Sequence, residues 1–257
     1  MKLRMISLVA VAIAIPASAQ SFLISQNGKS VGSATLTWVR NGAAYSITSN
    51  ASITMQGLNL SFSESGYLGA HVNLRSMQLN GQVNGTPATV GAQINGGQYL
   101  MKIFANAQHI NTPLAYHART VFLPDFDPAG LQAMLRLGAA YNNANIWAMI
   151  PKQTGSIVPM RIVTDADMQG TLNGSHISVH HFTVSVNGGT IEVFSSMASD
   201  LLQAEWTQEG FAIVHQGFVL TPPKHPIGTP PPPPPQNAQQ GTQQNGQPQP
   251  PPAQQPQ

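Results

Sequence analysis

The chain has 257 residues, of which only 8% are charged, with 11 Lys and Arg against 9 Asp and Glu. Ordinary domains contain about 25% charged residues, and so dilute a positive charge offers no basic patch that could follow a nucleic-acid backbone. The absence of cysteine excludes disulfides, thiolate metal ligands and a lipid-modified cysteine.

Residues 1–19 have the layout of a secretory signal peptide. Lys2 and Arg4 precede an apolar run, and an A-x-A cleavage site begins at Ala17. The apolar run is shorter than the roughly 20 residues that a membrane-spanning helix needs. We therefore expect a mature chain that starts at Gln20, has no integral membrane segment and is periplasmic or extracellular. Without Lys2 and Arg4 the 11 basic residues become 9, which balance the 9 acidic ones.

Residues 20–110 follow the pattern of short antiparallel strands. Asn-Gly pairs that begin at Asn27, Asn41 and Asn84 are strong hairpin signals, because a two-residue type I′ turn needs a positive φ twice. Between the turns apolar residues occupy every second position, as from Leu58 to Phe62. These features predict an antiparallel meander of about seven strands.

A loop at residues 111–127, bracketed by prolines, interrupts the strands and leads into the only helix that the sequence predicts. Asp127 is placed to cap this helix, and Pro128 suits the first helical position because its missing N–H is not needed there. Gly138 is predicted to be the left-handed residue that ends the helix.

Strands resume after the helix, at residues 146–150, 157–163, 175–186, 190–195, 201–206 and 211–220. In the segment 175–186, Ile177 and Val179 alternate in one phase, whereas Phe182 and Val184 alternate in the other. One extra residue at His180-His181 would place all four on one face. The pattern therefore predicts a β-bulge there.

Beyond residue 221 the composition changes abruptly, and fourteen of the 21 prolines lie in residues 222–257. Gln, Asn and Gly supply most of the rest, so no apolar set offsets the entropy of ordering, and we expect a disordered tail with polyproline II character. Two uses of this tail remain open. It is either a solvated spacer or a proline-rich ligand for a cell-envelope partner.

The order of strands and turns resembles the exported β-meander domains grouped as DUF3108-like, which are similar in outline to periplasmic lipoprotein-carrier half-barrels. The resemblance is carried by the opening strand, turn and re-entry at residues 22–34, by the loop and helix at 124–138, and by the closing segments 191–194, 201–206 and 210–214. It implies a strongly curved sheet with a helix on its concave side and leaves room for an apolar groove. It implies no catalytic residues.

Together these features predict a single all-β domain over residues 20–221. We expect a curved antiparallel meander or half-barrel with one short helix packed on the concave face, followed by the disordered tail.

The densest cluster of titratable groups lies at residues 116–127. His117 as a base, Asp125 as an orienting carboxylate and Arg119 as an anion clamp would suit a hydrolase. The alternative is structural: Asp127 caps the helix, and Arg119 and Asp125 form an ion pair that fixes the loop. The sequence has no G-x-S-x-G nucleophile elbow and no phosphate-binding glycine loop.

The histidines predict no metal site. His176 and His180 are four residues apart on a predicted strand, roughly 13 Å at about 3.3 Å per residue, and no H-x-H or H-E-x-x-H motif occurs. We expect no cofactor either.

Apolar residues of the helix and of two following strands are candidates for the lining of a ligand groove, because methionine adapts to irregular guests. These candidates are Leu131, Met134, Leu135, Leu137, Met149 and Met160. The leading hypothesis is a non-enzymatic exported envelope protein that binds a lipid or another apolar or amphiphilic ligand between helix and sheet. The alternatives are a scaffolding protein that acts through its Pro/Gln-rich tail, and a hydrolase that uses the 116–127 loop.

Overall fold

The computed structural model describes residues 19–152 and 154–222. These residues form one large, unclosed, mainly antiparallel sheet with a single helix on its concave side, which confirms the predicted all-β architecture. Residues 1–18 of the expected leader (1–19) and residues 223–257 of the expected Pro/Gln-rich tail (222–257) lie outside the described residues. No described helix is long and apolar enough to cross a bilayer.

The first half of the sheet is an antiparallel meander in which each strand pairs with the next along the chain. It has eight strands, one more than predicted: β1 (Ala19–Gln26), β2 (Lys29–Asn41), β3 (Ala44–Met55), β4 (Leu58–Leu68), β5 (Leu74–Val83), β6 (Thr86–Asn95), β7 (Gln98–Ala105) and β8 (Gln108–Ala115). Two of the predicted turns have both central residues at positive φ, with Asn27 at 49° and Gly28 at 75°, and Asn84 at 49° and Gly85 at 78°.

The second half comprises β9 (Thr120–Phe122), α1 (Pro128–Tyr141), β10 (Ile146–Ile150), β11 (Ser156–Thr164), β12 (Met168–Leu172), β13 (Ser175–Val186), β14 (Gly189–Ser196), β15 (Leu201–Trp206), β16 (Phe211–His215) and β17 (Phe218–Thr221). The two halves are joined because β16 pairs with β1, with Phe22 opposite His215. From β16 the order runs through β15 and β14 to β13, which pairs with both β11 and β12. Only β9 and β10 pair in parallel among the described pairings.

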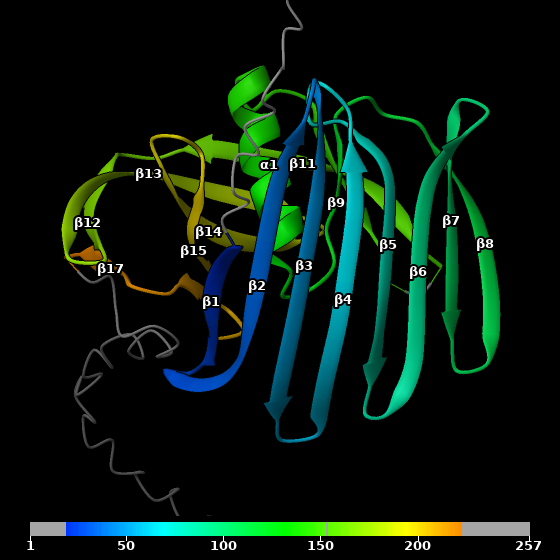
Figure 1. Ribbon diagram of the computed structural model, residues 1–257, viewed down its shortest axis with the longest axis horizontal. Coiled ribbons are helices and arrows are strands. Elements are labelled where there is room, and N and C mark those ends of the chain that lie inside the picture. Colours follow the sequence, from blue (N-terminus) through cyan, green and yellow to red (C-terminus); the bar gives the residue numbers. More distant parts are fainter. Residues whose placement is uncertain (1–18, 153, 223–257) are drawn as a thin grey trace, which may run out of the picture.

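The curled sheet encloses the helix between its two halves. In Figure 1, β2 to β6 run side by side in front, α1 lies behind β2 and β3, and strands of the second half cross behind them. The helix makes its main contacts with β2 and β3 on one side and with β9, β10 and β15 on the other. A helix enclosed in this way must be apolar around most of its surface, and α1 is buried from Pro128 to Leu135.

The start of α1 is as predicted and its end is not. Asp127 caps the helix by accepting hydrogen bonds from the backbone N–H groups of Ala129 and Gly130, each at 3.1 Å. The helix continues past Gly138 to Tyr141, and the left-handed residue at its end is Asn142, with φ of 51°. Asparagine also tolerates this conformation.

The predicted bulge in β13 is wrong, because β13 pairs with β14 in continuous register from Val179 to Val186. The two phases of β13 face two different cores. Val184 belongs to the main core around the helix, whereas Val179 packs in a smaller core with Phe194 and Phe218. The irregularity lies in the neighbouring segment, where residues 165–167 span the step between the β11 and β12 pairings.

Candidate functional site

An apolar groove of about 270 Å³ opens at one end of the concave face. Its floor is formed by β4, β5 and β6, and its far wall by the loops that precede α1 and follow β10. The apolar lining residues are Leu58, Leu60, Phe62, Leu79, Val83, Ala88, Val90, Pro124, Phe126 and Pro151. The helix leaves this region uncovered, because its main contacts with the first half of the sheet are with β2 and β3.

Two residues of β5, Gly81 and Val83, line the groove. Gly81 faces Phe62 across the β4–β5 pair, and a Cβ at this glycine would lie only 2.4 Å from the carbonyl oxygen of Ser61. Val83, near the end of β5, is 40% exposed and therefore offers an apolar surface at the rim. An antiparallel sheet usually turns such residues toward a core, whereas here Val83 is exposed at the edge of an open apolar groove.

Phe126 forms part of the groove wall in an unusual backbone conformation. Its φ is 60°, a value that is strained for a bulky residue by about 1–3 kcal/mol. Its ring packs edge-on against Phe211, with centroids 4.7 Å apart, and lies 6.2 Å from the ring of Trp206. Such strain persists only where the surroundings hold it, and here it places an aromatic ring at the groove.

A buried acidic pair begins at the residue after Phe126, where Asp127 meets Glu64 of β4. The hydroxyl of Ser49 donates to the Asp127 carboxylate, which also accepts the two helix N–H groups. Glu64 is fully buried, and beyond the neighbouring Asp127 carboxylate neither of its oxygens has a hydrogen-bond partner among the described residues. Because Asp127 already receives three donors, Asp127 is the ionised member of the pair and Glu64 holds the proton.

The pKa values of both carboxyls are raised. Burial raises the pKa of Glu64 well above its ordinary value, and the charge of Asp127 and the hydrogen bond to it raise it further. Burial also raises the pKa of Asp127, against the lowering effect of the hydrogen bonds from Ser49, Glu64 and the helix N-terminus.

Glu64→Gln is expected to flatten the dependence of stability on pH. A carboxyl whose pKa rises on folding contributes stability that is fully present below its unfolded value of about 4.3 and is lost as the pH rises through the folded value. The wild type should therefore lose stability from about pH 4.3 upward, and the Glu64→Gln variant should lose less, with the residual slope due to Asp127. The measurement is the urea concentration at the midpoint of unfolding, determined for both proteins at several pH values between about 4.3 and 8. If stability depends on pH in the same way in the wild type and in the variant, the raised pKa of Glu64 is contradicted.

A second cleft, of about 360 Å³, adjoins the apolar groove. The two hollows share Pro124, Asp125 and Lys152, which lie between them. The cleft is more polar than the groove, and it is lined by Trp206 and Glu209 and by the β13–β14 turn with Gly188. Lys152 and Asp125 form an ion pair at 3.0 Å, with side chains 59% and 55% exposed.

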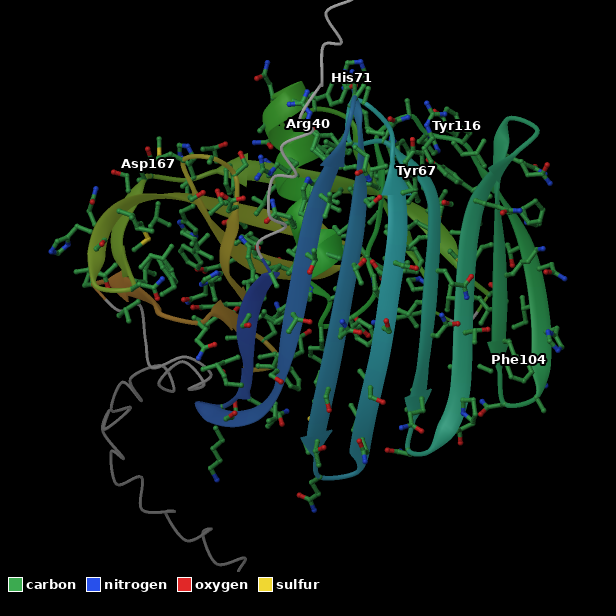
Figure 2. The ribbon with its side chains drawn as sticks, in the orientation of Figure 1. Arg40, Tyr67, His71, Phe104, Tyr116 and Asp167 are labelled. Atoms are coloured by element: carbon green, nitrogen blue, oxygen red, sulfur yellow. The ribbon has the colours of Figure 1, made fainter. Side chains whose placement is uncertain are left out.

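A larger hollow, of about 510 Å³, lies on the opposite, outer face of β3 to β7. It is lined largely by hydroxyl and amide side chains such as Thr48, Ser65 and Gln78. In Figure 2 side chains tipped with oxygen or nitrogen stand along this near face, where Tyr67 is labelled. This composition is typical of the solvated face of an antiparallel sheet, so we assign no site there.

The six groove candidates named from the sequence lie in the main core, with 0 to 6% of each residue exposed. None of them lines the apolar groove: Leu131, Met134, Leu135, Leu137, Met149 and Met160. The residues that do line it could have been found from the alternation in β4 and β5, which places Leu58, Leu60, Leu79 and Val83 on the concave face. The sequence does not show that the helix leaves them uncovered.

The structure does not bring the three candidates of the 116–127 loop together. His117 stacks on Trp147, with ring centroids 3.7 Å apart. The Arg119 guanidinium lies 4.1 Å from the centre of the Tyr141 ring and donates to the carbonyl of Ala144 at 2.8 Å. The predicted ion pair between Arg119 and Asp125 is wrong, since Asp125 pairs with Lys152 instead.

The histidines of β13 have carboxylate neighbours. His180 lies 2.8 Å from Asp167, and His181 lies 3.7 Å from Asp165 and 3.5 Å from Glu192 while its ring stacks on Phe194. Across residues 19–152 and 154–222, no group of three or more His, Cys, Asp or Glu side chains is arranged to hold a metal ion.

Comparison with protein-family models finds no match, and neither does comparison with curated proteins. Among solved structures, the chain is similar to a β-barrel-like protein of the domain of unknown function DUF1849 from Brucella abortus, with a TM-score of 0.48, 7% identity and coverage of 79% of this chain and 95% of that one. It is also similar to a DUF1089 family protein from Pseudomonas aeruginosa, with a TM-score of 0.38, 9% identity and coverage of 77% and 95%.

Proposed function

We propose that the protein is an exported, non-enzymatic binding protein for an apolar or amphiphilic ligand, whose hydrocarbon part lies in the groove between β4–β6 and Phe126. The observation that carries this proposal is the groove itself. It is open, and Asp125 and Lys152 are the only charged residues among those that line it in the described part of the chain.

The groove is suited to a hydrocarbon chain because burial of apolar surface provides the affinity. Each methylene that leaves water contributes about 0.8 kcal/mol, and the groove presents aliphatic side chains from three adjacent strands. The two charged residues that line the groove, Asp125 and Lys152, form an ion pair and also line the adjoining cleft. This division into an apolar body and a charged edge matches an amphiphile.

The strained backbone at Phe126 also favours function over simple packing. Backbone strain concentrates at ligand-binding positions, where the surroundings over-determine it. Here the adjacent helix cap at Asp127 and the ring contact with Phe211 hold Phe126 in place. The wall of the groove is thereby formed before a ligand arrives.

Two sequence features support export and a carrier role. The leader at residues 1–19 predicts export, and β1 begins at Ala19, immediately before the expected first residue of the mature chain. The resemblance to DUF3108-like domains and to periplasmic lipoprotein-carrier half-barrels implies a curved sheet with a helix on its concave side and leaves room for an apolar groove. In this proposal the groove lies beside the helix N-terminus and its residues replace the six core candidates as the binding surface.

Val83→Glu is expected to abolish binding of the apolar ligand without unfolding the protein. Val83 lines the groove and is 40% exposed, so the new carboxylate remains solvated in the free protein but would be buried by a hydrocarbon chain. The measurement is native mass spectrometry of the full chain purified from an exporting host. The wild type should carry a bound ligand of discrete mass that is lost on denaturation. The mass of the protein itself should be that of a chain that begins at Gln20.

Val219→Glu is the matched control. Val219 is 58% exposed on β17, outside the lining of the groove, and receives the same substitution. It should retain the bound mass of the wild type. A wild type that carries no ligand and takes up none from an added lipid mixture would refute the proposal, and so would equal loss from both variants.

A further inference from the structure

We propose that the ligand is a single-chain amphiphile with a zwitterionic headgroup, whose hydrocarbon chain lies in the apolar groove and whose headgroup lies in the adjoining cleft. This inference rests on the proposed function and specifies the ligand of the same site. It follows from how the two hollows join and from the charges of the cleft.

The groove and the cleft meet at a shared boundary. Pro124, Asp125 and Lys152 line both hollows. On the groove side Phe126 forms the wall, and its ring lies 6.2 Å from that of Trp206, which lines the cleft. A ligand that crosses this boundary therefore has an apolar surface on one side and a polar one on the other.

The size of the two hollows also favours an extended ligand. The groove alone, at about 270 Å³, lies just below the usual range for small-molecule sites of about 300–1,000 Å³. With the adjoining cleft of about 360 Å³ the site lies within that range. A ligand that fills both has a tail and a headgroup of comparable size.

The charges that line the cleft match a headgroup with one charge of each sign. Lys152 is the only cationic residue among its lining residues in the described chain, and Asp125 and Glu209 are the acidic ones. A phosphate that approaches Lys152 replaces Asp125 as its partner, which is feasible because both side chains of that ion pair are more than half exposed.

A cationic group at the other end of the headgroup has its own partners in the same cleft. Glu209 supplies a carboxylate, and Trp206 supplies an aromatic face of the type that binds ammonium groups best. The backbone N–H of Glu209 donates to the carbonyl of Trp206 at 3.2 Å, so the turn fixes the two residues near one another. A purely anionic headgroup would satisfy Lys152 but would share the cleft with the carboxylates of Asp125 and Glu209.

The test compares four surfactants that share one dodecyl chain, each used below its micelle concentration with the full mature chain. Dodecylphosphocholine is zwitterionic, dodecyl phosphate anionic, dodecyltrimethylammonium cationic and dodecyl maltoside neutral. By calorimetric titration, dodecylphosphocholine should bind about tenfold more tightly than each of the other three, which is the size expected of one additional cation–π contact with ion pairing.

Two variants assign the two charges of the headgroup. Glu209→Gln should weaken the binding of dodecylphosphocholine and of dodecyltrimethylammonium, and it should not weaken the binding of dodecyl phosphate. Lys152→Gln should weaken the binding of both phosphate-containing surfactants, and it should not weaken the binding of dodecyltrimethylammonium. The matched controls are Asp167→Asn and Lys102→Gln, which remove exposed charges away from both hollows and should change none of the four affinities.

The outcomes separate this inference from the function on which it rests. Equal binding of all four surfactants, or equal binding of dodecyl phosphate and dodecylphosphocholine, would overturn the zwitterionic headgroup and leave the groove as a binding site for hydrocarbon chains. Binding of none of them would overturn both proposals.

Discussion

Asp127→Ala is expected to lower the free energy of unfolding by about 2–4 kcal/mol, because it removes two kinds of interaction at once. Loss of a helix N-cap costs about 0.5–2 kcal/mol, and a buried polar group without its partner costs about 1–3 kcal/mol. Asp127 caps α1 through Ala129 and Gly130, and it accepts the buried hydroxyl of Ser49. Chemical denaturation in urea, with the slope checked for constancy, provides the measurement.

The control for this variant is Asp127→Asn. The asparagine side chain retains one carbonyl oxygen that can cap the helix, so it should lose much less stability than the alanine variant. Because Phe126 is held next to the cap, Asp127→Ala should also weaken binding in the groove. If the alanine and asparagine variants have equal stability, the capping role of the Asp127 carboxylate is refuted.

Gly130→Ala is expected to destabilise the protein although alanine is the better helix former. The propensity difference alone would stabilise α1 by about 1 kcal/mol. A Cβ at residue 130 would lie 2.4 Å from the carbonyl oxygen of Phe122. This oxygen cannot move away easily, since Phe122 pairs with Met149 in the β9–β10 ladder and the next N–H, from Leu123, donates to Met149 at 2.9 Å. Overpacking of this kind costs about 1–3 kcal/mol, which is expected to outweigh the propensity gain of about 1 kcal/mol.

Gly138→Ala provides the contrast within the same helix. The nearest atom to a Cβ there, also at 2.4 Å, is the side-chain oxygen of Asn143, which can rotate away. The gain in propensity should therefore offset most of the cost, and the melting temperature should remain within a few degrees of the wild type. Equal destabilisation by the two alanines would show that contact with a rigid backbone atom does not decide the outcome.

The parts of the fold that depend on neighbouring residues could be predicted from the sequence. The Asn27-Gly28 and Asn84-Gly85 turns fix hairpins locally, because each needs only two residues with positive φ. The start of α1 was equally local, since Asp127 and Pro128 act within one turn. Its end was missed because the chain offers two residues that tolerate the left-handed conformation, and Asn142 rather than Gly138 adopts it.

Features that depend on distant contacts could not be predicted. The bulge expected in β13 assumed one buried face, whereas Val179 and Val184 pack into two separate cores. Asp125 was expected to pair with Arg119 in its own loop, but the structure brings Lys152 from the loop after β10. The groove was missed for the same reason, because only the path of the helix decides which residues of the concave face remain open.

The pairing of β1 with β16 has a consequence for how the chain folds. Phe22 lies opposite His215, so one of the first strands to be synthesised pairs with one of the last. The contacts that join the two halves of the sheet therefore close very long loops, and chains rich in such contacts fold slowly, in milliseconds to seconds. The eight-strand meander can pair locally as it emerges, but its curl around α1 is complete only when β16 is available. Until then β1 presents an unpaired edge, which makes the late arrival of β16 the step at which misassembly competes with folding.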